Sequence, residues 1–242
     1  MFKIYHFYKD ELNLYGDCGN IYYLQYFLNL FGIKSSIAYV DKNTKDLEEC
    51  DFIFAGGGPD LLQNSIFTDF VSKKAFVQKH INDGKPSLFI CGSFQLLGKY
   101  YQTAEGEKIP GLSIFDFYTY SPSNQNKRIV GNIVSNVSFN TTPFPSSVVG
   151  FENHNGRTVL NSPLKPFSVV NLKTQGNNDS DFTEGLLYKK TIGTYFHGPL
   201  LVKNPHILFY LLKEYLPKDF KFDPRLLTSE YLSYQNAFSK NR

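Results

Sequence analysis

The stretch PSLFICGSFQLLG, Pro86–Gly98, carries the pattern that decides the fold. Ser87–Ile90 is apolar and is preceded by Gly84 and Pro86, which is typical of a short strand covered on both faces. Cys91 follows this strand directly, and helix-forming residues begin soon after it. The stretch therefore predicts a buried strand, a sharp turn at Cys91 and the start of a helix.

A cysteine at such a turn is a candidate nucleophile. The turn lifts the side chain out of the sheet toward the positive end of the helix, which favours the reactive thiolate. Gly92 supplies the small residue that the turn needs. Free cysteines more often act as small buried hydrophobes, and we assign that role to Cys18 and Cys50. For Cys91 the turn alone leaves both interpretations open.

Composition restricts the class of protein. The 242 residues are 42% hydrophobic with a net charge of +3, enough for one large core or two modest ones, and no apolar run approaches the ~20 residues of a membrane span. The N-terminus has early charges and no small-residue cleavage site, so we expect a cytoplasmic protein without a signal peptide. Three cysteines without a C-x-x-C pair predict free thiols and no zinc site. Because Lys and Arg are dispersed, we expect no nucleic-acid partner.

Strands and helices alternate in the first part of the chain. The expected elements are strands at Phe2–Phe7, Lys34–Val40 and Cys50–Ala55, and helical segments at Ile21–Phe31 and 60–82. Asp17 or Asn20 is expected to cap the first helix, which Gly32 ends. This alternation predicts an α/β fold, with a mostly parallel central sheet flanked by helices on both faces.

The pattern becomes richer in strands after about Ile109. The expected elements are strands at Leu112–Tyr120, Arg128–Phe139, Ser147–Glu152, Glu184–Lys189 and Thr191–Phe196, followed by a helix over Pro205–Leu216. No linker separates them from the first part, so residues 1–216 are assigned to one domain. Residues 217–242 form a C-terminal extension that is expected to be helical or to dock a partner.

Three loops are expected to meet at the carboxyl edge of the sheet: the loop after Phe7, the glycine loop Gly56–Gly58 and the turn at Cys91. Three glycines can form a tight turn or a phosphate cradle, but neither standard nucleotide-binding motif is present. Beside a cysteine nucleophile, we expect the N–H groups of Gly57 or Gly58 and of Gly92 to form an oxyanion hole.

A cysteine nucleophile needs a base, and His197 is the preferred candidate. It ends the strand Thr191–Phe196, which places it at the same sheet edge as Cys91, and Gly198 leaves room for its ring. The other histidines are expected to be structural, solvated or in capping positions, with His154 as a second one in a polar turn; they are His6, His80, His154 and His206. The chain shows no ligand spacing for a metal.

Six motifs between Glu11 and Pro205 together resemble the class I glutamine amidotransferase domains of the cobyric acid synthase-like branch. They are ELNLYGDCGN, FAGGGPD, ICGSFQLLG, IPGL, GFENHNGRT and IGTYFHGPLLVKNP. Within that branch they are similar to the glutaminase subunits of lipid II isoglutaminyl synthases. The resemblance implies a flavodoxin-like fold with additional β-rich segments.

The resemblance also implies an activity. Such a subunit hydrolyses L-glutamine to glutamate and ammonia, and passes the ammonia to a Mur ligase-like synthetase subunit in a heterodimer. The synthetase amidates the α-carboxylate of D-glutamate in lipid II, during peptidoglycan synthesis. No cofactor is implied for this chain, and ATP and Mg²⁺ are expected in the partner. A cobyrinate-type acceptor for the ammonia and a catalytically silent binding subunit stay open as alternatives.

Motif by motif, the resemblance implies roles for single residues. Cys91 forms a γ-glutamyl thioester, His197 acts as base and then as acid, and Arg128 holds the carboxylate of the substrate. Without the resemblance, Arg128 is interpreted as a solvated cation at a strand edge. Pro199 stands where many relatives have a glutamate, so we expect an acidic residue of the partner or a backbone carbonyl to orient His197.

The remaining polar residues of ELNLYGDCGN and GFENHNGRT can be internal supports or docking surfaces, and we expect them to support the site from outside the catalytic set. They are Asp17, Asn20, Glu152, Asn153 and His154. Ser93 and Phe94 replace the Gly-Tyr pair that more often follows C-G, and the serine side chain is expected to narrow the turn slightly.

Overall fold

The computed structural model describes residues 1–58, 60–123, 128–141, 144–172 and 174–217. Within them, the central sheet has six strands in the order β13-β14-β4-β3-β1-β2, all parallel except β13. Their bounds are Phe2–Phe7 (β1), Ser35–Val40 (β2), Phe52–Ala55 (β3), Ser87–Ile90 (β4), Leu186–Tyr188 (β13) and Thr191–Thr194 (β14). Strands β3 and β4 are buried at every position, as expected for parallel strands with both faces covered.

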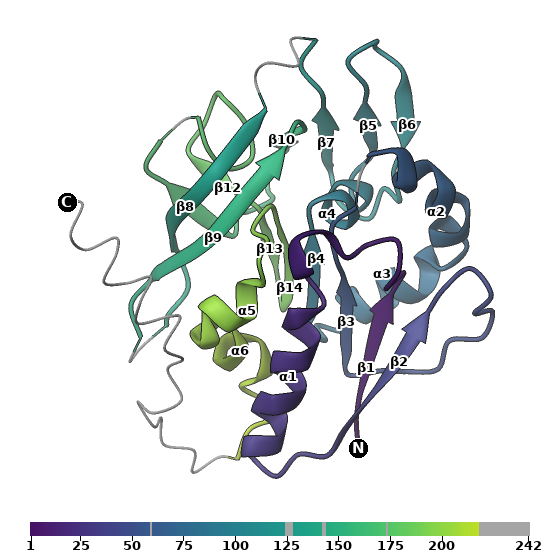
Figure 1. The fold of residues 1–242 in the computed structure, drawn as a ribbon, viewed down its shortest axis with the longest axis vertical. Helices are drawn as coiled ribbons and strands as arrows, with labels where there is room; N and C mark the ends of the chain where they lie inside the picture. Colours follow the sequence, from purple (N-terminus) through teal and green to yellow (C-terminus); the bar gives the residue numbers. More distant parts are fainter. Residues whose placement is uncertain (59, 124–127, 142–143, 173, 218–242) are drawn as a thin grey trace.

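Helices cover both faces of this sheet (Figure 1). Their bounds are Gly19–Leu30 (α1), Asp60–Ser72 (α2), Lys74–Asn82 (α3), Gly92–Leu96 (α4), Leu200–Lys203 (α5) and Pro205–Leu212 (α6). On one face α1 packs against α6, with the rings of Phe27 and Phe209 4.9 Å apart. On the other face Phe7 of β1 meets Phe70 of α2 at 5.8 Å. The predicted α/β architecture is confirmed.

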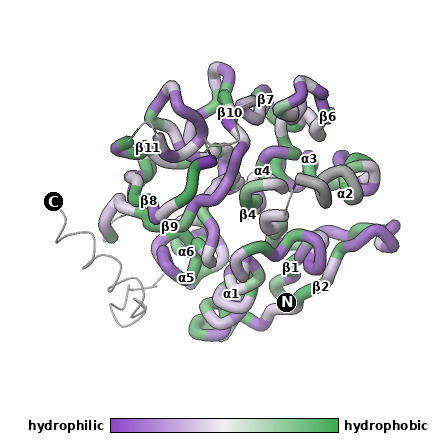
Figure 2. Tube along the Cα trace, turned by 45° about the horizontal axis from the view of Figure 1, so that its top comes forward, coloured by the Kyte–Doolittle hydropathy of each residue, from purple (hydrophilic) through white to green (hydrophobic). Residues whose placement is uncertain are grey.

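Two smaller sheets hold the additional β-rich segments. One has the order β10-β7-β5-β6 and the other β12-β11-β8-β9. Their bounds are Tyr100–Gln102 (β5), Lys108–Pro110 (β6), Phe117–Tyr120 (β7), Ile129–Val137 (β8), Ser147–His154 (β9), Arg157–Leu160 (β10), Ser168–Val170 (β11) and Thr183–Glu184 (β12). In Figure 2 the connecting loops are largely hydrophilic, whereas hydrophobic residues recur along the strands and helices.

Strand β9 links the second small sheet to the central one. Phe151 of β9 forms an antiparallel bridge with His197, just beyond the end of β14. The His197 N–H donates to the Phe151 carbonyl at 2.8 Å, and the Phe151 N–H donates back at 3.3 Å. The backbone of the expected catalytic histidine is therefore fixed from both sides, by β14 and by β9.

Some predicted details are wrong. Neither Asp17 nor Asn20 caps α1, because its N-cap is Cys18 and no side chain caps it; Asn20 instead accepts the Leu201 N–H at 2.8 Å. The last helix ends at Leu212 and not at Leu216. The prediction for the C-terminal extension falls on residues 218–242, outside the described residues.

Candidate active site

Cys91 sits at a strained turn between β4 and α4. Its backbone has φ 51° and ψ −108°, an unfavourable region for a residue with a side chain, as expected at a nucleophile elbow. The side chain is 7% exposed. The first helical bond of α4 runs from the Gln95 N–H to the Cys91 carbonyl. The N–H groups of the first turn, starting with that of Gly92, therefore have no partner within the helix.

Ser93 braces this turn. Its hydroxyl accepts the Ile90 N–H at 2.9 Å and donates to the Ala55 carbonyl at 2.7 Å. The serine thus ties the carboxyl ends of β3 and β4 together, which places the glycine loop beside Cys91. The expectation that Ser93 merely narrows the turn missed this role.

Asp17 orients His197. Its Oδ2 atom accepts a hydrogen bond from His197 Nδ1 at 2.9 Å, and both side chains are fully buried. The hypothesis that the partner or a backbone carbonyl must orient the histidine is therefore wrong for this structure, since the chain supplies its own carboxylate. A signal was present in the sequence: Asp17 lies in the loop after the first strand, which we expected at the same sheet edge.

The surroundings of His197 favour its charged form. Burial opposes the charge, but the charge and hydrogen bond of Asp17, together with Cys91, raise the pKa of His197 to about 10. Nε2 is buried and makes no hydrogen bond within the described part of the chain. With Nδ1 held by Asp17, Nε2 is the nitrogen left to exchange a proton with Cys91 and the substrate.

Gly57 lies at the centre of these groups. A methyl group at its α-carbon would lie 2.4 Å from His197 Cε1, 3.2 Å from Cys91 Cβ and 3.3 Å from Asp17 Oδ2, so the three side chains surround one small space. Its N–H donates to Asp17 Oδ2 at 2.9 Å. That N–H is therefore engaged and does not face a developing oxyanion, which corrects one of the two predicted alternatives. Gly58 and Gly92 are left as the candidate donors.

Arg128 reaches the site through other residues. Its Nη2 and Nε donate to the carbonyl and side-chain oxygens of Asn153, the former at 3.1 Å. Asn153 Nδ2 donates to the hydroxyl of Tyr15, and the Tyr15 ring lies edge-to-face on His197 with 4.9 Å between centroids. Arg128 also lines a cavity of about 490 Å³ together with Glu152. The structure thus connects Arg128 to His197 without direct contact.

Two further motif residues, Glu152 and His154, support the site from β9 itself. Burial raises the pKa of Glu152 to about 7, while one of its oxygens accepts the Gly176 N–H at 3.0 Å. Burial lowers the pKa of His154 to about 3, and its ring stacks on Tyr195 with centroids 3.7 Å apart. Tyr195 lies two residues before His197, so the stack holds the segment that carries the candidate base.

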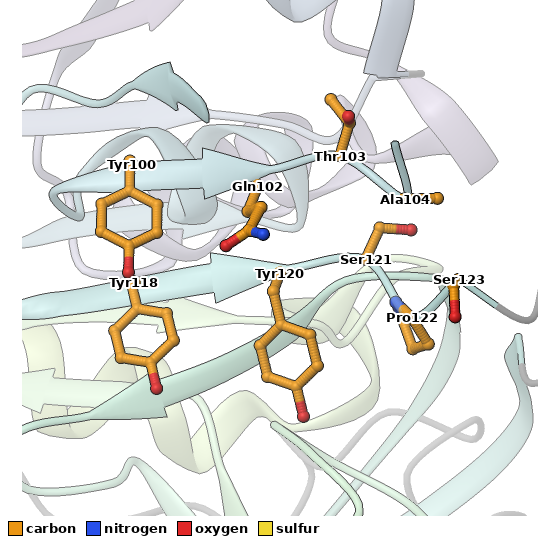
Figure 3. Close-up of a pocket in the computed structure, with 9 residues that line it drawn as sticks. All are labelled: Tyr100, Gln102, Thr103, Ala104, Tyr118, Tyr120, Ser121, Pro122 and Ser123. Atoms are coloured by element: carbon orange, nitrogen blue, oxygen red, sulfur yellow. The ribbon is translucent and has the colours of Figure 1, made fainter. Parts of the chain in front are cut away.

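A separate pocket of about 630 Å³ opens on the first small sheet. Figure 3 shows the side chains of Tyr100, Tyr118 and Tyr120 lying along neighbouring strands there, with Gln102 and Ser121 beside them. None of the residues of the candidate site is in its lining. The pocket is therefore not where the Cys91 chemistry takes place.

Neither a cluster of metal ligands nor a membrane-crossing helix is present among the described residues. No three His, Cys, Asp or Glu side chains in this part of the chain gather as ligands of a metal ion would. No helix within the same residues is long and apolar enough to cross a bilayer.

A strained elbow at Cys91 with the buried His197–Asp17 pair, at one edge of an α/β sheet, is typical of enzymes that use a cysteine nucleophile. Comparison with known proteins agrees. A profile of the CobB/CobQ-like glutamine amidotransferase domain matches residues 3–205, and the chain belongs to this family. It is an enzyme of the glutamine-hydrolysing amidotransferase class.

Sequence relatives narrow the comparison. The chain is 40% identical, over 94% of its length and 90% of the relative, to "Lipid II isoglutaminyl synthase (glutamine-hydrolyzing) subunit GatD" of Staphylococcus aureus. The protein of the same name from Streptococcus pneumoniae is 37% identical, over 93% of this chain and 84% of the relative. A probable cobyric acid synthase of Picrophilus torridus is 29% identical, over 75% of this chain but 37% of that protein.

Solved structures show the same fold. PurLQS from Thermotoga maritima has a TM-score of 0.61 at 15% identity, covering 88% of this chain and 99% of that chain. A glutamine amidotransferase from the same organism has a TM-score of 0.56 at 16% identity, covering 99% of this chain and 94% of that chain. At these identities the likeness concerns the fold alone.

Proposed function

We propose that this chain is the glutaminase subunit of a lipid II isoglutaminyl synthase. It hydrolyses L-glutamine at Cys91 and delivers ammonia to a Mur ligase-like partner, which amidates the α-carboxylate of D-glutamate in lipid II. The observation that carries the proposal is the buried Asp17–His197 pair beside the Cys91 elbow. The named relatives at 40% and 37% identity support this acceptor over a cobyrinate-type acid, whose synthases are more distant.

The first half of the reaction forms the thioester. The Cys91 thiolate attacks the carboxamide carbon, and the carbonyl electron pair moves onto oxygen, where the N–H groups of Gly92 and Gly58 stabilise it. His197 then gives the proton on Nε2 to the amide nitrogen. The carbon–nitrogen bond breaks, ammonia leaves, and a γ-glutamyl thioester stays on the sulfur.

The second half restores the enzyme. Neutral His197 takes a proton from a water molecule, which attacks the thioester carbon and displaces the Cys91 thiolate. Glutamate leaves, and His197 again holds the proton that Asp17 stabilises. Throughout both steps the Asp17 carboxylate keeps Nδ1 protonated and therefore directs Nε2 to the reacting atoms.

The partner supplies the remaining chemistry. We place ATP and Mg²⁺ in a synthetase subunit that activates the acceptor carboxylate, with no cofactor in this chain. The two proteins act as a heterodimer in the cytoplasm, where the free thiols of Cys18, Cys50 and Cys91 are stable. Arg128 holds the α-carboxylate of glutamine during hydrolysis.

The test measures ammonia and glutamate release from L-glutamine with the partner present. Cys91→Ala is expected to abolish release and labelling by diazo-oxo-norleucine. The matched control is Cys50→Ala, because Cys50 also lies beside a histidine, with its sulfur 3.5 Å from His80 Nδ1, and burial raises the pKa of Cys50 to about 12. Unchanged release in Cys91→Ala would end the assignment. Release without amidation of lipid II would point to another acceptor.

A further inference from the structure

Tyr15 has an unusual position that the hydrolytic steps do not use. It lies in the 3-10 turn Leu14–Gly16, with a left-handed backbone at φ 55°, and its side chain is 45% exposed. Its ring nevertheless covers the buried His197, at a centroid distance of 4.9 Å and an interplanar angle of 68°. Asp17 follows two residues later, so one short loop supplies both the hydrogen-bond partner of the imidazole and a ring that packs on it.

The hydroxyl of Tyr15 begins a chain of hydrogen bonds that ends at Arg128. Asn153 Nδ2 donates to the Tyr15 hydroxyl, and Asn153 accepts two bonds from Arg128 through its side-chain and main-chain oxygens. The three residues come from separate parts of the fold: Tyr15 from the loop after β1, Asn153 from the strand β9 and Arg128 from the position just before β8. Asn153 is thus the link between the arginine and the loop over His197.

We propose that Tyr15 is a positioning residue for His197, and that Asn153 couples its placement to the binding of the substrate carboxylate at Arg128. The inference rests on the proposed function, because it takes Arg128 as the site of that carboxylate. Its consequence is specificity: the base is best aligned when the amide that enters also carries an α-carboxylate.

The geometry explains how the coupling works. A guanidinium has five N–H donors in a fixed plane, of which two hold Asn153. A carboxylate that binds the outer edge in a bidentate manner fixes the orientation of this plane, and with it Asn153 and the Tyr15 hydroxyl. Because Arg128 is exposed, without substrate it exchanges these bonds with water. The Tyr15 ring is then held less firmly, and the His197 imidazole keeps its hydrogen bond to Asp17 but loses part of the restraint that the ring provides.

A purely structural role for Tyr15 makes a different prediction. The ring also packs on Phe151, 5.5 Å away, and Tyr15→Phe keeps both ring contacts while removing only the hydroxyl. If packing were all that mattered, this variant would behave as the wild type. If the chain to Arg128 matters, Tyr15→Phe lowers kcat/KM for glutamine by about tenfold, the equivalent of one hydrogen bond, with most of the loss in kcat.

The matched control is Tyr39→Phe. Tyr39 on β2 is 50% exposed and also packs against a histidine ring, that of His6, at 5.9 Å, but β2 is the edge strand and β1 separates it from β3 and β4. Its loss of a hydroxyl is expected to leave kcat and KM unchanged. Thermal unfolding of both variants and of wild type verifies that each is folded.

The decisive experiment varies the substrate and Arg128, in the complex with the synthetase. Tyr15→Phe is expected to slow glutamine hydrolysis but not the slow hydrolysis of 4-aminobutanamide, which lacks the α-carboxylate. In an Arg128→Ala background, Tyr15→Phe is expected to have no further effect on glutamine. Asn153→Ala provides a second variant with the same expected pattern, in case Tyr15→Phe does not fold.

Three outcomes would overturn the inference: Tyr15→Phe within twofold of wild type on glutamine, equal losses with both amides, or additive effects of Tyr15→Phe and Arg128→Ala. Each is distinguishable from failure of the proposed function. If the proposed function were wrong, the wild-type complex itself would release no glutamate, or Cys91→Ala would release as much glutamate as wild type.

Discussion

Replacing Asp17 by asparagine removes one buried negative charge and almost no volume. The carboxylate lies 2.9 Å from His197 Nδ1, and at an effective dielectric constant of 20 the attraction between unit charges at that distance is about 6 kcal/mol. An asparagine oxygen still accepts the Nδ1–H bond, which retains part of this energy. We expect a net loss of about 3 to 4 kcal/mol for the imidazolium, and a fall of about 10²- to 10³-fold in kcat/KM. The same change in a serine protease triad costs about 10⁴-fold.

The assay compares glutamate release by wild type, Asp17→Asn and Asp69→Asn, each with and without the synthetase. Asp69 is the matched control, because its carboxylate binds Lys73 and the Tyr8 hydroxyl in the α2 region. Activity of Asp17→Asn within threefold of wild type would refute the role of this carboxylate. Loss in the isolated chain with full recovery in the complex would show that an acidic residue of the partner takes its place.

The same variant has a pH signature. The pKa of His197 is raised from 6.5 to about 10, so its interaction with Asp17 stabilises the fold fully below pH 6.5 and is lost as the pH rises through about 10. Asp17→Asn lacks this contribution. The free energies of unfolding of wild type and variant are therefore expected to differ most below pH 6.5 and to converge near pH 10, in urea titrations at several pH values.

Three more predictions follow from single contacts. Gly57→Ala is expected to abolish turnover, because the added methyl would lie 2.4 Å from His197 Cε1 and displace the imidazole, and the protein is expected to stay folded. Retained turnover would show that the imidazole can adopt another active position. Ser93→Ala leaves the buried Ile90 N–H without its hydroxyl partner, and is expected to lower the free energy of unfolding by about 1 to 3 kcal/mol in urea; an unchanged midpoint would mean that the turn does not need the brace. Glu184 has its pKa raised from 4.5 to about 8 by burial, so it contributes a loss of stability as the pH rises through this range. Glu152 and His197 contribute in the same direction, so Glu184→Gln is expected to show a shallower slope than wild type, and an equal slope in both proteins would assign the whole effect to the other groups.

Much of the fold could be predicted because the sequences of its central strands are short, continuous apolar runs. The segments FIFA of β3 and SLFI of β4 are buried at all positions. Short apolar runs of this kind are typical of strands in the middle of a sheet whose two faces are both covered. The turn at Cys91 was predictable for the same reason, since it is the first residue beyond such a run.

The residue that orients His197 was not predicted, although Asp17 lies in a loop expected at the same sheet edge, because the contact joins distant parts of the chain. Asp17 and His197 are 180 positions apart. They meet because β14 pairs with β4, and because the start of α1 approaches the segment after His197, where a methyl on Gly19 would lie 2.6 Å from Pro199. Pro199 was interpreted as the loss of an orienting carboxylate. Pro199 also packs against Gly19, two residues after Asp17, which supplies the carboxylate that orients His197.

Burial of the other histidines was missed for a related reason. His80 and His206 were expected at solvated or capping positions, yet they are 4% and 1% exposed. Burial lowers the pKa of His80 to about 4, and its Nε2 lies 3.1 Å from the Pro86 carbonyl, which precedes β4. Without knowledge of the neighbouring elements, a polar residue on a helix is expected to face solvent. Helical periodicity does not show whether another element packs on the polar face.

The structure divides the site into two halves that the glycine loop and β9 hold together. The half formed by Cys91 and its turn depends on Ser93, which ties β3 to β4. The half formed by His197 depends on Asp17 and on the bridge to Phe151. Gly57 contacts both halves, since its N–H binds Asp17 and its α-carbon borders Cys91. A small shift of this loop would change the nucleophile, the base and the carboxylate at once. The loop after β1 and the glycine loop are therefore the segments on which the relative placement of the three groups depends most directly.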